Sequence, residues 1–241
     1  MLIEPEGRSG PDNMALDHAL LEEADASGAA FLRLYRWNPP CLSFGRNEPA
    51  LARYDREAIA ARGIAVVRRP TGGRAVWHEH EVTYAVAAPV AQFGSLTESY
   101  CDIHARLARA LSALGVDARL APAGPSAPLG AGACFAASAG GEVLVGDRKV
   151  VGSAQVRHGT AFLQHGSILL DGSQDVVRAV SHQPSAVSET TLAKELGRPV
   201  TFAEVADAIV ASWDEPMSTA PYRPLPSPTA RFSDPAWIWR R

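Results

Sequence analysis

The sequence has no long apolar run, little net charge and no leader-like start, and each of these shortages excludes a class of protein. No apolar run reaches the roughly 18 residues that a membrane-spanning helix needs. The opening MLIEPEGRSGPDN lacks the basic flank and apolar core of a secretory signal. A net charge of -3 argues against a nucleic-acid-binding protein, which normally carries a basic excess. We therefore expect neither a membrane protein nor a nucleic-acid partner.

Cysteine is also scarce, and its spacing is uninformative for metals. Cys41, Cys101 and Cys134 are widely separated and form no CxxC pair, which argues against zinc-ribbon and thioredoxin-type sites. His78 and His80 share a strand face, but no third ligand with suitable spacing follows them. We predict no metal site, and we interpret the cysteines as free thiols in a reducing cytoplasm, with Cys41 and Cys101 used for packing.

Lysine occurs only at Lys149 and Lys194, and every other side chain of the Lys/Arg type is arginine. Lys149 lies in the segment GDRKVVGSAQ, directly after a Gly-Asp pair that favours a turn. Its ammonium is a compact point charge, which the longer, forked guanidinium of arginine would place differently. From these residues alone, a solvated lysine after a turn is the simpler interpretation.

Apolar periodicity and turn residues predict several helices and a larger number of short strands. The predicted helices cover 14–26, 51–63, 95–115 and 201–213, the first capped by Asn13 and the third capped by Ser95 and ended by Gly115. The predicted strands cover 31–37, 41–45, 64–69, 75–89, 116–122, 142–145, 149–157 and 160–170. Because the strands gather in hairpins, we predict an α+β fold with a mixed, mostly antiparallel sheet flanked by helices. The proline-rich end is expected to be irregular.

A glycine-rich loop between two predicted strands is the strongest candidate site. Its sequence is Arg68-Arg69-Pro70-Thr71-Gly72-Gly73-Arg74. Adjacent glycines allow positive φ angles and a close backbone approach, so their amides could hold an anionic or carbonyl oxygen. The loop is neither a Walker loop nor a dinucleotide fingerprint. A plain hairpin turn with exposed arginines is the alternative.

The loop stands among other motifs in a particular order. NMALDHAL, RLYRWNPPCLSFGRNEP, RRPTGGRAVWHEHEVTYAV and DRKVVGSAQVR…LQHGSILL follow one another across nearly the whole chain. Together they resemble the biotin/lipoate A/B protein ligase family, and most closely its Gram-positive-type octanoyl-[acyl carrier protein]:protein N-octanoyltransferases. The resemblance implies a class II synthetase-like fold, with residues 1–215 as the catalytic domain. Residues 216–241 would then be a proline-rich tail packed on that domain.

The resemblance also implies roles for particular residues. Lys149 matches the active-site lysine of a KxxGxA pattern, where it would hold an acyl carbonyl, and Gly152 belongs to the same pattern. His78 matches a supporting site histidine, and His165 would line or brace an acyl channel. Further substrate-binding candidates come from the glycine loop, with its arginines as docking groups for the phosphate of a carrier protein: Arg68, Arg69, Thr71, Gly72, Gly73 and Arg74. Asp17, on the first helix, is interpreted as a solvated carboxylate.

Cys134-Phe135 occupies the place of a cysteine that carries the acyl group as a thioester in the resembled transferases. The expected reaction moves octanoyl, or lipoyl, from acyl carrier protein to a lysine of a lipoyl domain, such as the glycine cleavage H protein or a dehydrogenase E2 subunit. No cofactor is then required. The proline, serine and aromatic usual after this cysteine are replaced by Ala136-Ala137-Ser138. An ATP- and Mg-dependent lipoate–protein ligase, or an amidotransferase that moves octanoyl between lipoyl domains, therefore stays open. A non-catalytic acyl- or lipoyl-domain-binding protein is a further alternative.

Overall fold

The computed structural model of the 241-residue chain describes residues 1–121, 141–183, 189–213 and 229–240. Its strands are β1 Leu2–Arg8, β2 Phe31–Trp37, β3 Cys41–Phe44, β4 Ala65–Arg68, β5 Val76–His78, β6 Glu81–Pro89, β7 Ala118–Leu120, β8 Val143–Val145, β9 Arg148–Lys149, β10 Val151–His158 and β11 Ala161–Leu169. Its helices are α1 Gly10–Ser27, α2 Ala50–Arg53, α3 Arg56–Ala61, α4 Leu96–Ala113, α5 Asp175–Ala179, α6 Leu192–Leu196, α7 Phe202–Ala211, α8 Thr229–Ser233 and α9 Pro235–Ile238, with a 3-10 turn at Val90–Gln92.

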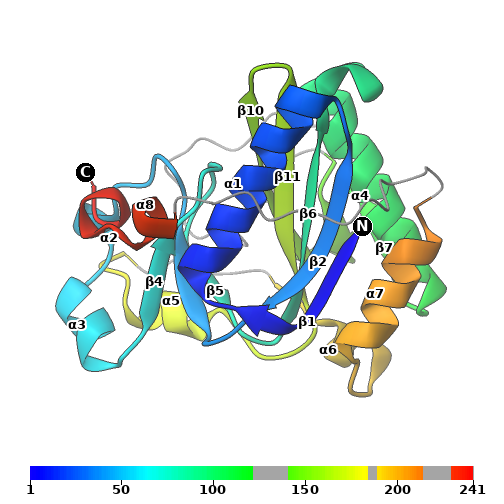
Figure 1. The fold of residues 1–241 in the computed structure, drawn as a ribbon. Helices are drawn as coiled ribbons and strands as arrows, with labels where there is room; N and C mark the ends of the chain where they lie inside the picture. The colour runs from blue at the N-terminus through cyan, green and yellow to red at the C-terminus, as the bar shows by residue number, and fades with distance from the viewer. Residues whose placement is uncertain (122–140, 184–188, 214–228, 241) are drawn as a thin grey trace.

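A five-stranded sheet in the order β1-β2-β6-β11-β10 forms the centre of the molecule (Figure 1). Only β1 runs parallel to its neighbour, and the other pairs are antiparallel. Along β2, Leu32 and Leu34 pack into the core that includes α4 and α7, whereas Phe31 and Tyr35 join the core beneath α1. The two-residue alternation of side chains in a strand thus gives this sheet two buried faces. The predicted α+β fold is confirmed.

Two smaller sheets complete the fold. β3 lies between β4 and β5, so the glycine loop crosses from one edge of this second sheet to the other rather than closing a hairpin. The third sheet, β7-β8-β9, carries Lys149 at its last position. The backbone groups of Ala121 bond those of Gly141 and Glu142, at 3.0 and 2.7 Å.

Three local predictions were wrong at element boundaries. The region 51–63 forms two short helices, because Tyr54 is extended and the Asp55 carboxylate caps the second helix by accepting from the Ala58 amide. The region 75–89 divides into β5 and β6, which belong to different sheets. The first helix begins at Gly10 with Ser9 as its cap, and Asn13 is instead buried inside it.

The C-terminal segment also differs from the irregular tail that was expected. Its described residues, 229–240, form α8 and α9, which lie beside α1 and β4 (Figure 1). Phe232 enters the core under α1, while Ile238 and Trp239 join a third cluster around Phe44. Asp234 caps α9, and Pro235 occupies its first turn, where a missing N–H costs little.

Among the helices of the described residues, none is both long enough and apolar enough to cross a membrane.

Candidate active site

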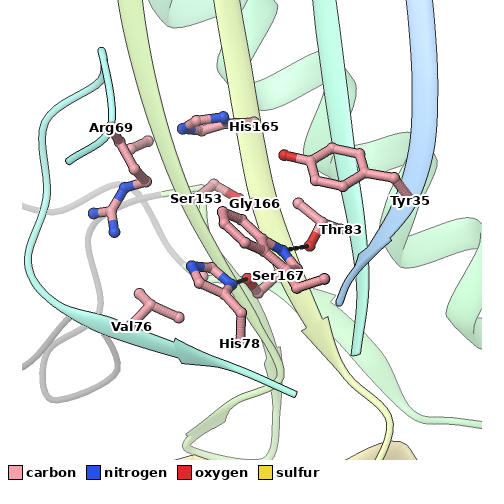
Figure 2. A pocket seen from close by; sticks show the side chains of 12 residues that line it. Tyr35, Arg69, Val76, His78, Thr83, Ser153, His165, Gly166 and Ser167 are labelled. Atoms are coloured by element: carbon pink, nitrogen blue, oxygen red, sulfur yellow. Dashed lines mark hydrogen bonds between the residues drawn. The ribbon is translucent and has the colours of Figure 1, made fainter. Parts of the chain in front are cut away.

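A pocket of about 300 Å³ lies where the central sheet meets the second sheet. Figure 2 shows side chains from both sheets and from the glycine loop facing it. Its lining residues are Tyr35, Trp37, Arg69, Val76, His78, Thr83, Gly152, Ser153, Ala154, His165, Gly166 and Ser167. Most of these side chains are polar, but their polar groups are largely taken up in hydrogen bonds, so the surface that faces the pocket is mostly apolar, as expected of a site for a small organic group.

Small residues on β10 and β11 keep one wall of the pocket flat. Gly152 pairs with Ser167, and Ser153 pairs with Gly166. A Cβ at Gly166 would lie 2.5 Å from both the Gly152 carbonyl oxygen and the Ser153 Oγ, closer than real Cβ atoms come. No larger residue fits at Gly166 without moving the strands.

Arg69 holds the glycine loop against the second sheet. Its NH1 donates to the carbonyl oxygen and Oγ of Ser43 at 3.0 and 2.5 Å, and its NH2 donates to the carbonyls of Gly72 and Arg74 at 3.1 and 2.7 Å. The guanidinium therefore fixes the loop by its backbone while also lining the pocket. Gly73 has a φ of +83°, which favours glycine.

A buried network joins helix α1 to the glycine loop. Asp17 accepts from Arg33 NH1 at 2.7 Å, from the Tyr35 hydroxyl at 2.8 Å and from His165 Nδ1 at 2.9 Å. Burial favours a raised pKa for Asp17, but Arg33 and the hydrogen bonds outweigh it and the pKa is lowered. Burial lowers the pKa of His165, so its neutral ring donates from Nδ1 and accepts the Thr71 hydroxyl at Nε2, 2.6 Å away. The interpretation of Asp17 as solvated was wrong.

His78 is held by a second buried carboxylate. Its Nδ1 donates to Glu81 Oε1 at 2.8 Å, its Nε2 lies 2.6 Å from Ser43 Oγ, and its ring stacks on Trp37 with centroids 4.0 Å apart. Glu81 Oε1 also accepts from the hydroxyls of Thr83 and Ser167, whereas its buried Oε2 has no hydrogen-bond partner in the described part of the chain. These contacts fix the histidine ring in the pocket wall.

Lys149 is buried and does not line the pocket. Its ammonium donates to Glu142 Oε1 at 2.5 Å. Both residues point to one face of the β8–β9 hairpin, because Lys149 pairs with Leu144 and Glu142 lies two positions before Leu144. The interpretation of Lys149 as a solvated lysine is thus excluded.

His104, on α4, lies between the lysine and the pocket. Its Nδ1 donates to the Gly141 carbonyl at 2.7 Å, and its Nε2 lies 2.8 Å from Oγ of Ser153, a pocket residue. Desolvation lowers its pKa to about 4, and the Lys149 charge also lowers it. The neutral ring accepts from the Ser153 hydroxyl and links α4 to the pocket wall.

The lowered pKa of His104 predicts a loss of stability in acid. The unfolded chain takes up a proton near the ordinary histidine pKa of about 6.5, whereas the folded chain does so only near 4. Between these values the unfolded state binds more protons, so the His104 contribution falls by roughly 3 kcal/mol as the pH drops through this window. Urea unfolding at pH 4.5 and 7.5 measures this loss of stability. His104→Gln should shrink the difference, and an unchanged difference would contradict the assignment.

The structure brings together only part of the predicted site. Arg69, His78, Gly152 and His165 line the pocket, and Thr71 joins them through His165. Gly72, Gly73 and Arg74 lie in the loop that Arg69 holds. Cys134 lies outside the described residues.

Arg68 does not line the pocket. It is fully buried, and it donates to the carbonyls of Gly45, Arg46, Glu48, Ile238 and Arg240. Such burial excludes the expected role in docking a carrier, because the guanidinium has no exposed surface. Cys41 is buried as expected, but Cys101 is exposed, so its assignment to packing was wrong.

Sequence reasoning missed three buried acids: Asp17, Glu81 and Glu142. Glu142 could have been found from the hairpin register of EVLVGDRKV, which places it on the face of Lys149. Asp17 contacts partners distant in sequence, and local patterns carry no signal for it. Glu81 was more accessible to prediction, because His78 and Thr83 are only three and two positions away, and only Ser167 is distant. Among the described residues, no group of histidine, cysteine or acidic side chains has the arrangement of a metal site.

A sequence pattern described as "Lipoyl protein ligase A/B catalytic domain" matches residues 9–214. The chain belongs to this family. Two relatives bear out the assignment, both called octanoyltransferase LipM. The protein from Symbiobacterium thermophilum is 38% identical, over 88% of this chain and 84% of its own length. The protein from Kyrpidia tusciae is 41% identical, over 84% and 81%.

The fold of the lipoyl protein ligase A/B family is also recognisable in solved structures. A lipoate-protein ligase A bound with ATP superposes with a TM-score of 0.74 at 22% identity, covering 87% of this chain and 82% of that protein. At this identity the likeness establishes the fold alone. The class II synthetase-like fold implied by the sequence motifs is therefore confirmed.

Proposed function

We propose that this protein is an acyltransferase of protein lipoylation. It moves octanoyl from acyl carrier protein to a lysine of a lipoyl-domain protein, with a thioester on Cys134 as the intermediate. The observation that carries the proposal is the identity of 38–41% to octanoyltransferases over more than four fifths of each chain. The described pocket, with its flat glycine wall, supports it as a place for the acyl group.

The reaction balances without ATP. The Cys134 thiolate attacks the carbonyl carbon of the donor thioester, the C–S bond to the donor breaks, and the donor thiol leaves with a proton. The acceptor amine then attacks the new thioester, an amide bond forms, and the Cys134 thiol is released. The first step exchanges one thioester for another, and the second is downhill because an amide replaces a thioester.

The remaining site residues act on the acyl group and on the developing charge. Each methylene buried against the pocket walls contributes about 0.8 kcal/mol. The Lys149 ammonium, positioned by Glu142, does not line the pocket, but its charge reaches His104, which contacts the pocket residue Ser153. That charge is the proposed stabiliser of the oxyanion formed in both attacks. The network of Asp17, His165 and Thr71 fixes the glycine loop beside the reacting carbonyl.

Several wider assignments belong to the same proposal. Residues 1–215 form the catalytic domain and 216–241 its tail, which the contacts of α8 with α1 support. The acceptor is the glycine cleavage H protein or a dehydrogenase E2 subunit. The required free thiol fits a reducing cytoplasm, and the chemistry requires neither a metal nor another cofactor.

Intact-protein mass spectrometry after mixing with octanoyl-acyl carrier protein tests this function. The wild type is expected to gain one octanoyl group that hydroxylamine removes and that a lipoyl domain collects. Cys134→Ser should lose transfer to the lipoyl domain by a factor on the order of a thousand or more. Cys101→Ser is the matched control and should behave as the wild type. Exchange of pyrophosphate into ATP with free lipoate, in place of acylation, would show a ligase and contradict the proposal.

A further inference from the structure

Three arginines gather beside the glycine loop, outside the pocket. The guanidinium carbons of Arg231 and Arg240 each lie 4.3 Å from the ring centre of Trp237. Arg240 donates to the backbone carbonyl of Arg46, whose own amide donates to the Thr71 carbonyl at 2.7 Å. We call Arg46, Arg231 and Arg240 the arginine cluster. It joins the C-terminal helices to the loop that carries Thr71.

No carboxylate forms an ion pair with the cluster anywhere in the described ranges. Asp234, close in sequence, instead caps α9 by accepting from the Ala236 amide at 2.8 Å. Burial and then the charges of Arg46 and Arg231 lower the pKa of Arg240. The positive charge of the cluster also affects the pKa of His18. Its pKa is lowered by burial and, against the opposing effect of Glu22, by Arg231, His158 and Arg46. Positive charge is therefore concentrated here, and no carboxylate of the described residues is paired with it.

The cluster differs from the other arginines around the loop. Arg68 is buried among backbone carbonyls, and Arg69 is committed to Ser43 and to the loop itself. Arg46 and Arg231 are exposed and Arg240 is half-buried, so all three remain accessible to solvent. Trp237 holds two of them in place by cation–π contacts, which limits the entropy lost when an anion binds.

We propose that the arginine cluster binds the phosphate of the pantetheine arm that presents the acyl thioester. This inference rests on the proposed function. Forked guanidinium groups match the geometry of phosphate oxygens, and two arginines on one aromatic ring make a compact site rather than an extended stripe. Recognition of an acidic protein surface would need a longer basic face, in a chain whose net charge is -3. The hydrogen bond from the Arg46 amide to the Thr71 carbonyl connects the cluster to the glycine loop, whose Arg69 lines the pocket.

Steady-state kinetics with two small donors test the site. Octanoyl-4′-phosphopantetheine and octanoyl-pantetheine differ only in the phosphate. The wild type is expected to have a KM about tenfold lower for the phosphorylated donor. In Arg46→Ala/Arg231→Ala this preference should disappear, while kcat and KM for octanoyl-pantetheine stay unchanged. Arg198→Ala, which removes an exposed arginine near α7, is the matched control and should keep the preference.

Two results would overturn the proposal. One is a wild-type enzyme that does not distinguish the two donors. The other is a double variant that is impaired only with the intact carrier protein, which would assign the cluster to an acidic protein surface. If no octanoyl thioester is turned over at all, the proposed function fails separately. In that case, calorimetry measures the binding of octanoyl-4′-phosphopantetheine to the wild type and to the double variant. Binding that the double variant loses supports the site. Equal binding by both proteins, or no binding by the wild type, refutes it.

Discussion

Replacing Lys149 by methionine is expected to reduce octanoyl transfer by a factor of about a hundred to a thousand, as measured by single-turnover transfer to a lipoyl domain. The proposed role is to place one positive charge where the carbonyl oxygen becomes negative. The same substitution removes the ammonium that contacts Glu142 at 2.5 Å in a buried setting. Stability should therefore also fall, by about 3–5 kcal/mol, because a buried carboxylate loses this counter-charge.

A double variant separates the two effects. Glu142→Gln/Lys149→Met removes both charges, so most of the lost stability should return in urea unfolding, whereas transfer should remain low. Lys194→Met is the matched control, since it removes the other lysine from an exposed position on α6. Recovery of transfer in the double variant would mean that Lys149 serves packing alone and that the oxyanion is stabilised by other groups.

Replacing Asp17 by asparagine is expected to destabilise the protein by about 3 kcal/mol, because buried Arg33 then loses the negative charge of its buried partner. Arg33 is fully buried, and Asp17 is its nearest fully buried acid, whereas Glu4 reaches it from the protein edge at 2.6 Å. Because the folded state lowers the pKa of Asp17, its contribution is complete above the ordinary aspartate pKa and is lost as the pH falls through the folded value. Urea unfolding at pH 7 and below pH 4 measures both effects.

Asp17→Asn should also alter catalysis through His165. An amide can offer a donor to Nδ1, which would reverse the tautomer and deprive the Thr71 hydroxyl of its acceptor. We expect a lower kcat with a nearly unchanged KM. Tyr35→Phe is the control, because it removes a different hydrogen bond from the same carboxylate and leaves the tautomer alone. Equal losses of kcat in both variants would indicate general loosening instead.

The sequence was sufficient for the elements whose side chains alternate clearly. Helix α4 starts at its predicted cap, Ser95, and the strands 31–37, 142–145 and 160–170 form with the two-residue period that defines their faces. The predicted ends of elements were wrong where contacts between segments distant in sequence determine where a strand or helix stops. The segment 75–89 was predicted as one strand, yet it breaks after His78 because β5 pairs with β3 and β6 pairs with β2.

The glycine loop of the candidate site could be predicted from the sequence, but the burial and pairing of its charged side chains could not. Adjacent glycines and one of only two lysines stand out in the linear sequence, so Gly73 and Lys149 could be selected. The burial of Arg68 could not, because its acceptors are backbone carbonyls, which every residue possesses. Likewise, Asp17 lies among apolar helix positions, and only β2 and β11 supply its partners. Burial and long-range pairing decide which charged groups can meet a substrate.

Arg68 imposes an uneven constraint on evolution at the C-terminal end. Its guanidinium takes backbone carbonyls from Ile238 and Arg240, not their side chains. The contacts with Arg68 therefore place no demand on side-chain identity here, which is set instead by the packing of Ile238 and Trp239 and by the proposed phosphate-binding role of Arg240. Deletions are not tolerated in the same way, since shortening the segment strips ligands from a buried cation 170 positions away. Homologues should accordingly conserve the length of this segment more strictly than its composition.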